Sequence, residues 1–327
     1  MVERSAESHV QSETSRRWAI GIDVGGTKIA GGLLDPLTGE TRFARAVPTR
    51  PERGGEAVLA DAVALAEVLA AKAAAGGCAV GSVGVGVAEL VDPEGRIASA
   101  QTIGWRGTDI GAAFAHVAPA RVEADVRAAA LAEGRFGAGR GLGLWAYVTV
   151  GTGIASTIVV DGKPLAGARG NALVLATGPV SVPCPGCGTL ATVVVEEVAS
   201  GPAIARRYRE ATGYPADRAE AVICAADVGN HAARAVVDSA AVALGSAIGW
   251  LVNVVDPEAV VVGGGLGTSG GRWWDRVVAS ARAHVWAEET RGLPLLPAAL
   301  GPAAGWIGAA LAGAAAEVSE RQESAAP

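Results

Sequence analysis

The sequence predicts an α/β fold with two similar domains, and three observations support this. Two strand–glycine turn–strand units recur about half a chain apart, at residues 18–34 and 144–160. Around the first unit, segments with strand and helix periodicity follow one another in a βββαβ order. The chain has 327 residues, of which 50% are hydrophobic, so it can fill a core in each domain.

The first turn is Gly21-Ile-Asp-Val-Gly-Gly-Thr-Lys28, between apolar runs at residues 18–20 and 29–34. Such a turn leaves backbone N–H groups uncovered, so several donors can hold one phosphate. The candidate phosphate-binding residues are Gly25, Gly26, Thr27 and Lys28. Asp23 precedes them, where its carboxylate could hold a Mg²⁺ that bridges to the phosphate. Taken alone, the turn could equally be an ordinary Gly-Gly hairpin.

In the first half of the chain, segments with the apolar spacing of a strand alternate with segments that have the spacing of a helix. Strands are expected at residues 18–23, 29–34, 40–47 and 82–87, with a further short strand ending near Val122. Helical spacing of apolar residues predicts helices at 54–75 and 126–136, the second of which begins beside Asp125. The glycine-rich stretch 137–143 then connects to the second half.

The second half opens with the repeated unit. Residues 144–150 and 154–160 are expected to form two strands. Gly151-Thr152-Gly153 is expected to form the turn between them, with backbone amides that side chains do not cover. Thr152 and Gly153 are therefore candidate phosphate-binding residues. A matched pair of turns is more specific than either turn alone. It predicts two similar domains facing each other, each presenting one turn to a shared cleft.

The rest of the second half is mainly helical. Helices are expected at residues 202–212, 216–227, 231–254 and 272–288. A short buried strand at 258–262 runs into Gly263, Gly264 and Gly265. A strand–glycines–helix unit commonly brings backbone next to a nucleotide, although a glycine run after a strand is often only a loop.

Composition excludes several classes of partner. The net charge is −6 with mixed signs along the chain, so there is no basic face for nucleic acid.

Four cysteines and no signal-like N-terminus indicate a cytoplasmic protein. The most apolar stretch, residues 236–255, is interrupted by polar side chains and predicts a buried helix rather than a membrane span. Residues 1–17 are expected to be a disordered tail, too short to hold a DNA-binding domain.

Four segments together resemble the ROK (repressor, open reading frame, kinase) family of bacterial sugar kinases. They are Asp23-Val-Gly-Gly-Thr-Lys28, Thr149-Val-Gly-Thr-Gly-Ile154, residues 251–266 and Gly305-Trp-Ile-Gly-Ala-Ala310. The resemblance implies an actin-like (ASKHA) two-domain kinase fold, with a hexose in the cleft and ATP mainly against the second domain. It divides the chain into residues 18–124 and 125–302, with a C-terminal helix at about 303–318 packing on the first domain. It also suggests a homodimer.

Asp125 falls on the family's catalytic-base position. A carboxylate there can take the proton of a primary alcohol as its oxygen attacks the γ-phosphate of ATP, while Mg²⁺ and the glycine turns neutralise the phosphoryl group. The alternative is that Asp125 is only an N-cap of the alanine-rich helix that follows.

The sugar-contacting positions depart from the family pattern. Ala124 replaces an asparagine, and Val174 and Thr177 stand where the family carries a glutamate and a histidine. Glu89 replaces a glycine and brings a carboxylate towards the expected pocket, although an exposed Glu89 is the simpler alternative. Because an unpaired buried polar group costs about 1–3 kcal/mol, glucose should fit such a pocket poorly.

The predicted substrate is therefore a modified hexose-like polyol. We expect a C7-cyclitol of the valiolone type, or an amino sugar of the kanosamine type whose amine pairs with Glu89, both of which are phosphorylated in antibiotic biosynthesis. Two alternatives stay open: an ordinary glucokinase, and a sugar-sensing ROK protein that does not catalyse. A DNA-binding repressor is disfavoured by the short tail.

The family's zinc motif is incomplete in this sequence. Only Cys184 and Cys187 stand close together, and Thr177 takes the place of the histidine ligand, so zinc is left undecided. A family glutamate that contacts the sugar corresponds to Glu196 or Glu197, with Glu196 preferred. Both could instead be the charged first turn of the next helix.

Overall fold

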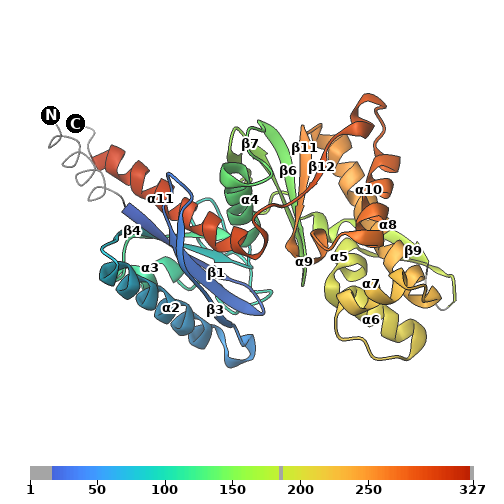
Figure 1. Ribbon diagram of the computed structural model, residues 1–327, viewed down its shortest axis with the longest axis horizontal. Coiled ribbons are helices and arrows are strands. Elements are labelled where there is room, and N and C mark those ends of the chain that lie inside the picture. The colour runs from blue at the N-terminus through green and yellow to red at the C-terminus, as the bar shows by residue number, and fades with distance from the viewer. Residues whose placement is uncertain (1–16, 184–186, 325–327) are drawn as a thin grey trace, which may run out of the picture. The chain divides into compact units, whose positions relative to one another are not determined.

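The computed structural model describes residues 17–183 and 187–324 (Figure 1). Its contacts divide the chain into unit 1, which comprises Met1–Phe136, Ala166–Asn171 and Ala303–Pro327, and unit 2, which comprises Gly137–Leu165 and Ala172–Pro302. The division after Phe136 differs from the sequence-based boundary before Asp125. Helix α4 (Asp125–Phe136) packs against the C-terminal helix α11 (Ala304–Ser324), and this contact between distant parts of the sequence assigns α4 to unit 1.

Unit 1 is a five-stranded mixed sheet with helices, drawn mainly in blue and green in Figure 1. The strand order is β3-β2-β1-β4-β5. The strands are β1 (Arg17–Val24), β2 (Lys28–Leu34), β3 (Thr41–Pro48), β4 (Ala79–Val87) and β5 (Ala120–Ala124). The helices are the 3₁₀ turn η1 (Pro51–Arg53), α2 (Gly55–Ala75), α3 (Ile110–Phe114), α4 and α11. The 3₁₀ turn η4 (Gly301–Ala303) precedes α11, and the division between the units falls within it, after Pro302. The β-β-β-α-β order expected from the sequence is present; the short helix α3 was not expected.

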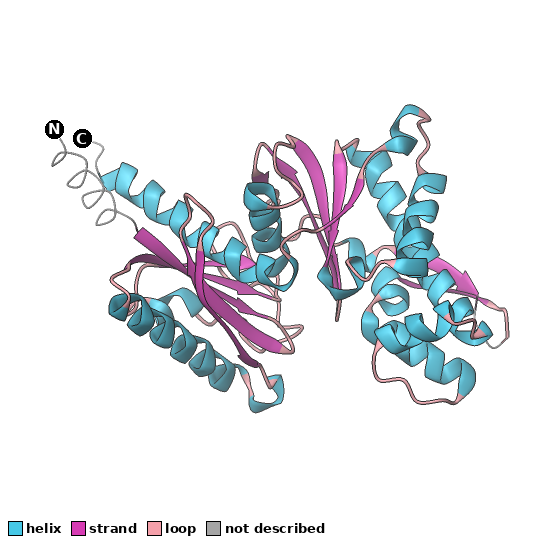
Figure 2. Ribbon diagram, viewed as in Figure 1, coloured by secondary structure: helices cyan, strands magenta, loops and turns pink. Residues whose placement is uncertain are grey.

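The two faces of the sheet in unit 1 differ because side chains alternate along a strand. In β1 and β4 the large residues, such as Ile22 and Val85, point to one face, where they pack in a core with Leu65 and Leu69 of α2. Figures 1 and 2 show α2 on one side of this sheet and α11 on the other.

The opposite face of β1 and β4 carries glycines, which allow the backbone of α11 to approach the sheet. A Cβ on Gly21 would overlap the carbonyl oxygen of Trp306, and one on Gly84 would overlap that of Ala309. The alternation of large residues with glycine in these strands is therefore a packing requirement, in addition to any role in ligand binding.

Unit 2 contains a second five-stranded sheet, a β-hairpin and most of the helices (Figure 2). The sheet has the order β12-β11-β6-β7-β8. Its strands are β6 (Leu144–Val150), β7 (Ile154–Val160), β8 (Lys163–Pro164), β11 (Ala259–Gly263) and β12 (Leu295–Pro297), and the hairpin is β9 (Pro179–Pro183) with β10 (Leu190–Val194). The helices are η2 (Leu175–Thr177), α5 (Val195–Ala199), α6 (Gly201–Thr212), α7 (Ala219–Asp227), α8 (His231–Val255), α9 (Gly264–Gly267), α10 (Gly271–His284) and η3 (Glu289–Gly292). The strands β8, β9, β10 and β12 were not expected.

Helix α8 is the core helix of unit 2. By length and composition it could cross a membrane, but 61% of its most apolar window is buried in the protein. Val236, Leu244 and Ile248 are fully buried there, together with Trp273 from α10. Burial among other helices accounts for the apolar sequence of α8, as expected for a core helix.

Candidate active site

Three carboxylates lie at one edge of the sheet in unit 1. Strands β1, β4 and β5 are parallel neighbours, and their last residues, Val24, Val87 and Ala124, are paired in register. Asp23, Glu89 and Asp125 therefore lie near the carboxyl ends of adjacent parallel strands. In open α/β sheets this edge is the usual position of a ligand site.

The turn between β1 and β2 is held by a buried threonine. The Thr49 hydroxyl donates to the carbonyl oxygen of Gly25 at 2.6 Å, and the Thr49 amide donates to that of Thr27 at 3.1 Å. Within the turn, the Gly25 amide donates to the Lys28 carbonyl at 3.0 Å. Thr27 and Lys28 are exposed, as a ligand-binding turn requires. Sequence reasoning missed Thr49, because its partners are more than twenty positions away and no local pattern marks it.

Asp23 and Asp125 have perturbed acidities. Burial raises the pKa of Asp23 to about 7; the nearby Asp125 carboxylate adds to this effect and Lys28 opposes it. Burial also raises the pKa of Asp125 to about 6; the Val126 amide and Arg127 oppose this rise, and the Glu89 charge adds to it. Two carboxylates shifted in this direction at one sheet edge are typical of a site for acid–base chemistry or cation binding.

These shifts predict an effect on stability. A carboxylate whose pKa is higher in the folded than in the unfolded protein stabilises the fold below about pH 4, and this contribution is lost as the pH rises through about 7. Asp23→Asn, which stays neutral, should therefore have a higher melting temperature than the wild type at about pH 8, and a similar one at about pH 4. Thermal denaturation at both pH values measures this. The exposed Asp275→Asn is the control, and an equal or lower melting temperature for Asp23→Asn at the higher pH would contradict the prediction.

The Asp125 side chain is not bonded as a normal helix N-cap. Its Oδ1 accepts from the amide of the next residue, Val126, at 2.6 Å, whereas a capping side chain accepts from an amide two or three positions further on. The start of α4 is instead fixed by Arg127, which is buried, pairs with Glu123 and donates to the carbonyl of Val91 at 2.7 Å. Asp125 is thus held in place while its second oxygen, Oδ2, has no hydrogen-bond partner among the described residues.

Glu89 is buried and fully engaged by protein donors. Its Oε1 accepts from the amides of Thr102 at 2.6 Å and Ile103 at 2.8 Å. Its Oε2 accepts from the Gln101 amide at 2.9 Å and from the Ser99 hydroxyl. A carboxylate has about four acceptor sites, and all four are used here. The expectation that Glu89 pairs with a substrate amine is therefore corrected, as is the alternative of an exposed Glu89.

The second glycine turn, in unit 2, is held from α5 and α6. The Gly151 amide donates to the Gly153 carbonyl at 2.9 Å, and the Gly201 amide donates to the Gly151 carbonyl at 2.8 Å. Glu196 Oε2 accepts from the Ile154 amide at 2.7 Å, directly beside Gly153. Thr152 and Gly153 are exposed. The geometry thus joins Glu196 to the turn.

Glu197 has a different position from Glu196. It is exposed, and its carboxylate accepts from the Val194 amide at 3.5 Å at the start of α5. Both glutamates lie in the first turn of α5, and Glu196 additionally contacts the glycine turn. Which of them contacts the sugar stays a prediction.

The three glycines at the end of β11 and the start of α9 have separate structural reasons. A Cβ on Gly263 would overlap the Tyr147 hydroxyl, and Gly264 has a positive φ of 80° and lies against the carbonyl of Val150. Gly265 is exposed and has open space where a Cβ would stand. Gly264 is exposed as well, so Gly264 and Gly265 have the free surface that a nucleotide would need, whereas Gly263 is buried.

The remaining predicted residues that the structure describes form no polar cluster. Ala124 is buried at the end of β5, Val174 is exposed, and the Thr177 hydroxyl donates to the Val174 carbonyl at 2.9 Å. Cys184 lies outside the described residues, and Cys187 is exposed. Within residues 17–183 and 187–324, no group of three or more His, Cys, Asp or Glu side chains could hold a metal ion.

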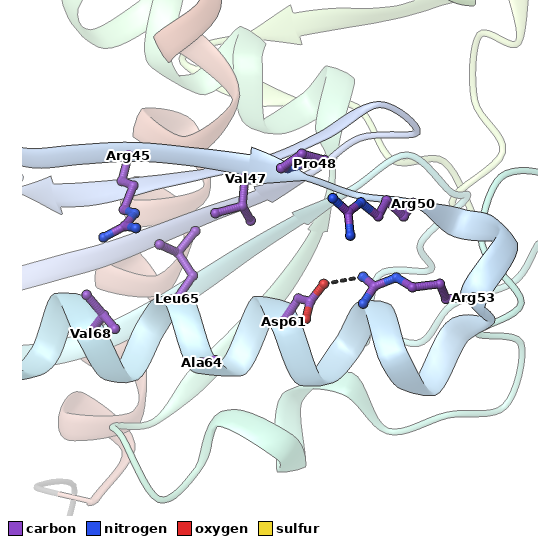
Figure 3. A pocket seen from close by; sticks show the side chains of 9 residues that line it. All are labelled: Arg45, Val47, Pro48, Arg50, Arg53, Asp61, Ala64, Leu65 and Val68. Carbon is purple, nitrogen blue, oxygen red and sulfur yellow. Dashed lines mark hydrogen bonds and ion pairs between the residues drawn. The ribbon is translucent and has the colours of Figure 1, made fainter.

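A shallow hollow of about 380 Å³ lies elsewhere in unit 1, between β3 and α2 (Figure 3). Arg45, Arg50 and Arg53 line it above an apolar floor that includes Leu65, and Arg53 is paired with Asp61. None of the sequence-predicted site residues lines this hollow. The carboxylate edge is therefore the better candidate for an active site.

Comparisons with known proteins agree with the resemblance. The ROK family model matches residues 19–314. A glucokinase from Halalkalibacterium halodurans is 32% identical over 317 residues, covering 90% of this chain and 94% of that protein. An N-acetyl-D-glucosamine kinase from Shigella flexneri is 30% identical over 263 residues, covering 75% and 83%. The crystal structure of a ROK family glucokinase from Streptomyces griseus in complex with glucose and AMPPNP matches with a TM-score of 0.75 and 30% identity, covering 91% of this chain and 99% of that one.

Proposed function

Because this chain belongs to the ROK family, we infer that it is an ATP-dependent sugar kinase with the actin-like fold, and we propose that Asp125 is its catalytic base. The observation that carries the role of Asp125 is its position at the carboxylate edge, with a pKa raised to about 6 and one oxygen available. A base with such a pKa is ionised at neutral pH and still takes a proton readily in the transition state.

In this proposal unit 1 performs the acceptor chemistry. Asp125 accepts the proton of a primary alcohol as the oxygen attacks the γ-phosphate, and the turn at Gly25, Gly26 and Thr27 binds phosphate oxygens through backbone amides. Asp23 fits a role in holding Mg²⁺, because its partly buried carboxylate has a raised pKa that a cation would offset. When bound, Mg²⁺ neutralises charge on the transferred phosphoryl group.

We assign the binding of the rest of the nucleotide to unit 2. Thr152 and Gly153 present an exposed turn whose shape is fixed by Glu196 and Gly201. Gly265 presents exposed backbone after β11, supported by the close packing of Gly263 and Gly264. The family resemblance also gives Glu196 a contact to the sugar; its carboxylate already accepts one amide and has further acceptor sites.

The finer proposal concerns the acceptor, for which a C7-cyclitol of the valiolone type is our first candidate. Ala124 and Val174 offer no hydrogen bond to a ring hydroxyl, and the Thr177 hydroxyl is engaged by backbone. Since Glu89 is saturated, an amine gains no partner there, and the kanosamine type becomes less favoured than an uncharged polyol. A role in antibiotic biosynthesis follows only if such an acceptor is found.

Steady-state ADP release with a panel of acceptors tests this proposal. Valiolone should have a higher kcat/KM than glucose, N-acetylglucosamine or kanosamine, because fewer of its polar groups are left unpaired. A lower KM and higher kcat/KM for glucose would instead establish an ordinary glucokinase. Absence of acceptor-dependent ADP release across the panel, together with measurable sugar binding by calorimetry, would support the non-catalytic sensor. Whether the protein is a homodimer stays a prediction, which sedimentation measurements can test.

A further inference from the structure

Glu89 forms an unusual anionic centre inside unit 1. Its side chain is 6% exposed, and no lysine, arginine or histidine pairs with it among the described residues. Burying a carboxylate without a cation is costly, and the four hydrogen bonds from Ser99, Gln101, Thr102 and Ile103 offset part of that cost. Three of the four donors are backbone amides, so this single side chain fixes the conformation of residues 99–103.

The fixed segment reaches the phosphate turn. Thr102 lies against Gly26 so closely that a Cβ on Gly26 would be 3.0 Å from the Thr102 Cγ2. The Thr102 hydroxyl donates to the carbonyl of Ala88 at 3.2 Å, and the Ala88 amide donates to the carbonyl of Val24 at 3.2 Å. Residues 99–103 are therefore tied to both the end of β1 and the turn that follows it.

The position of Glu89 also gives its charge a direct effect on the site. Strand β4, which precedes Glu89, lies between β1 and β5 in the sheet, so Glu89 extends from the strand between Asp23 and Asp125. The Glu89 charge contributes to the raised pKa of Asp125. An uncharged side chain at position 89 would not contribute to the raised pKa of Asp125.

We propose that Glu89 is a positioning residue for phosphoryl transfer: by clamping residues 99–103, it holds Thr102 against Gly26 and so fixes the phosphate turn. In this proposal, Glu89 itself does not contact the substrate. The proposal rests on the proposed kinase function, because it names the reaction that the fixed turn serves. It replaces the expectation that the carboxylate selects an amine on the acceptor.

The variant Glu89→Gln tests the clamp, since glutamine keeps the size of the side chain but turns an NH₂ group towards two of the four donors. Glu94→Gln is the matched control: Glu94 follows the same strand, is exposed and, among the described residues, has the exposed Arg96 as its one ion-pair partner, at 2.9 Å. In hydrogen–deuterium exchange, the amides of Gln101, Thr102 and Ile103 should exchange faster in Glu89→Gln than in the wild type or the control. This measurement does not require activity.

Kinetics of the same two variants test the positioning role. Glu89→Gln should lower kcat by roughly 10- to 100-fold, the effect of a displacement of about 1 Å at a reacting group, with a change in acceptor KM of less than about threefold. Glu94→Gln should match the wild type. A purely structural role would lower the melting temperature and the folded fraction but leave kcat per folded molecule unchanged.

Each result decides a separate point. Unchanged exchange at residues 101–103 would overturn the clamp, and faster exchange with an unchanged kcat would overturn its role in positioning. A wild type without acceptor-dependent activity would refute the proposed function, while the exchange data would still decide the clamp. If Glu89→Gln does not fold, Thr102→Ala, which removes the contact with Gly26 but keeps the amide, replaces it and should show the same loss of kcat.

Discussion

Replacement of Asp125 by asparagine is expected to lower kcat by about 10²- to 10⁴-fold, the usual contribution of a general base. Asparagine keeps the shape of the side chain and its hydrogen bond from the Val126 amide, but it cannot accept the alcohol proton. The fold and the affinity for the acceptor should therefore be preserved. Steady-state kinetics, with acceptor binding measured by calorimetry, check both parts.

The pH dependence of the same variant separates a base from a structural carboxylate. In the wild type kcat/KM should fall below about pH 6, because Asp125 becomes protonated there. The residual activity of Asp125→Asn should lack this acidic limb. Asp275→Asn, an exposed substitution in unit 2, should keep the wild-type rate and profile. If Asp125→Asn kept wild-type kcat, or the same acidic limb, the assignment of the base would be wrong.

Gly84→Ala is expected to lower the free energy of unfolding by about 3 kcal/mol or more, at the upper end of overpacking effects. A Cβ at this position would overlap the carbonyl oxygen and carbon of Ala309, so the obstacle is the backbone of α11 and cannot rotate away. Helix α11 would have to move off β1 and β4. Chemical denaturation measures the loss.

Gly292→Ala provides the control, because Gly292 has no atom within 4 Å of a built Cβ and no positive φ. Its free energy of unfolding should stay within about 0.5 kcal/mol of the wild type or rise slightly. An equally small effect for Gly84→Ala would show that α11 can shift at little cost, and the close packing of helix and sheet would not be a main source of stability.

Sequence patterns predicted the parts of the fold that depend on local order. Alternating apolar residues and glycine turns identified β1, β2, β6 and β7, and helical spacing identified α2, α6 and α8 to within a few residues. Short elements such as β8, β12 and α3 were missed because two to five residues carry too little periodicity to be recognised. The α/β class and the family were correctly predicted because the glycine turns and strand endings are themselves local patterns.

For the candidate site, too, sequence patterns and tertiary structure contributed different parts. The glycine turns and Asp23 were predicted from neighbouring residues, because their positions next to strand ends are local patterns, and Asp125 was assigned from the family resemblance; their roles in the site stay predictions. Only the tertiary structure showed the four hydrogen bonds to Glu89, whose donors lie ten to fourteen positions away, and revealed the contacts of Thr49 and Arg127. Likewise, the assignment of α4 to unit 1 depends on α11, more than 150 residues later. Local sequence fixes backbone shape, whereas the role of a buried polar side chain depends on which distant groups the fold brings to it.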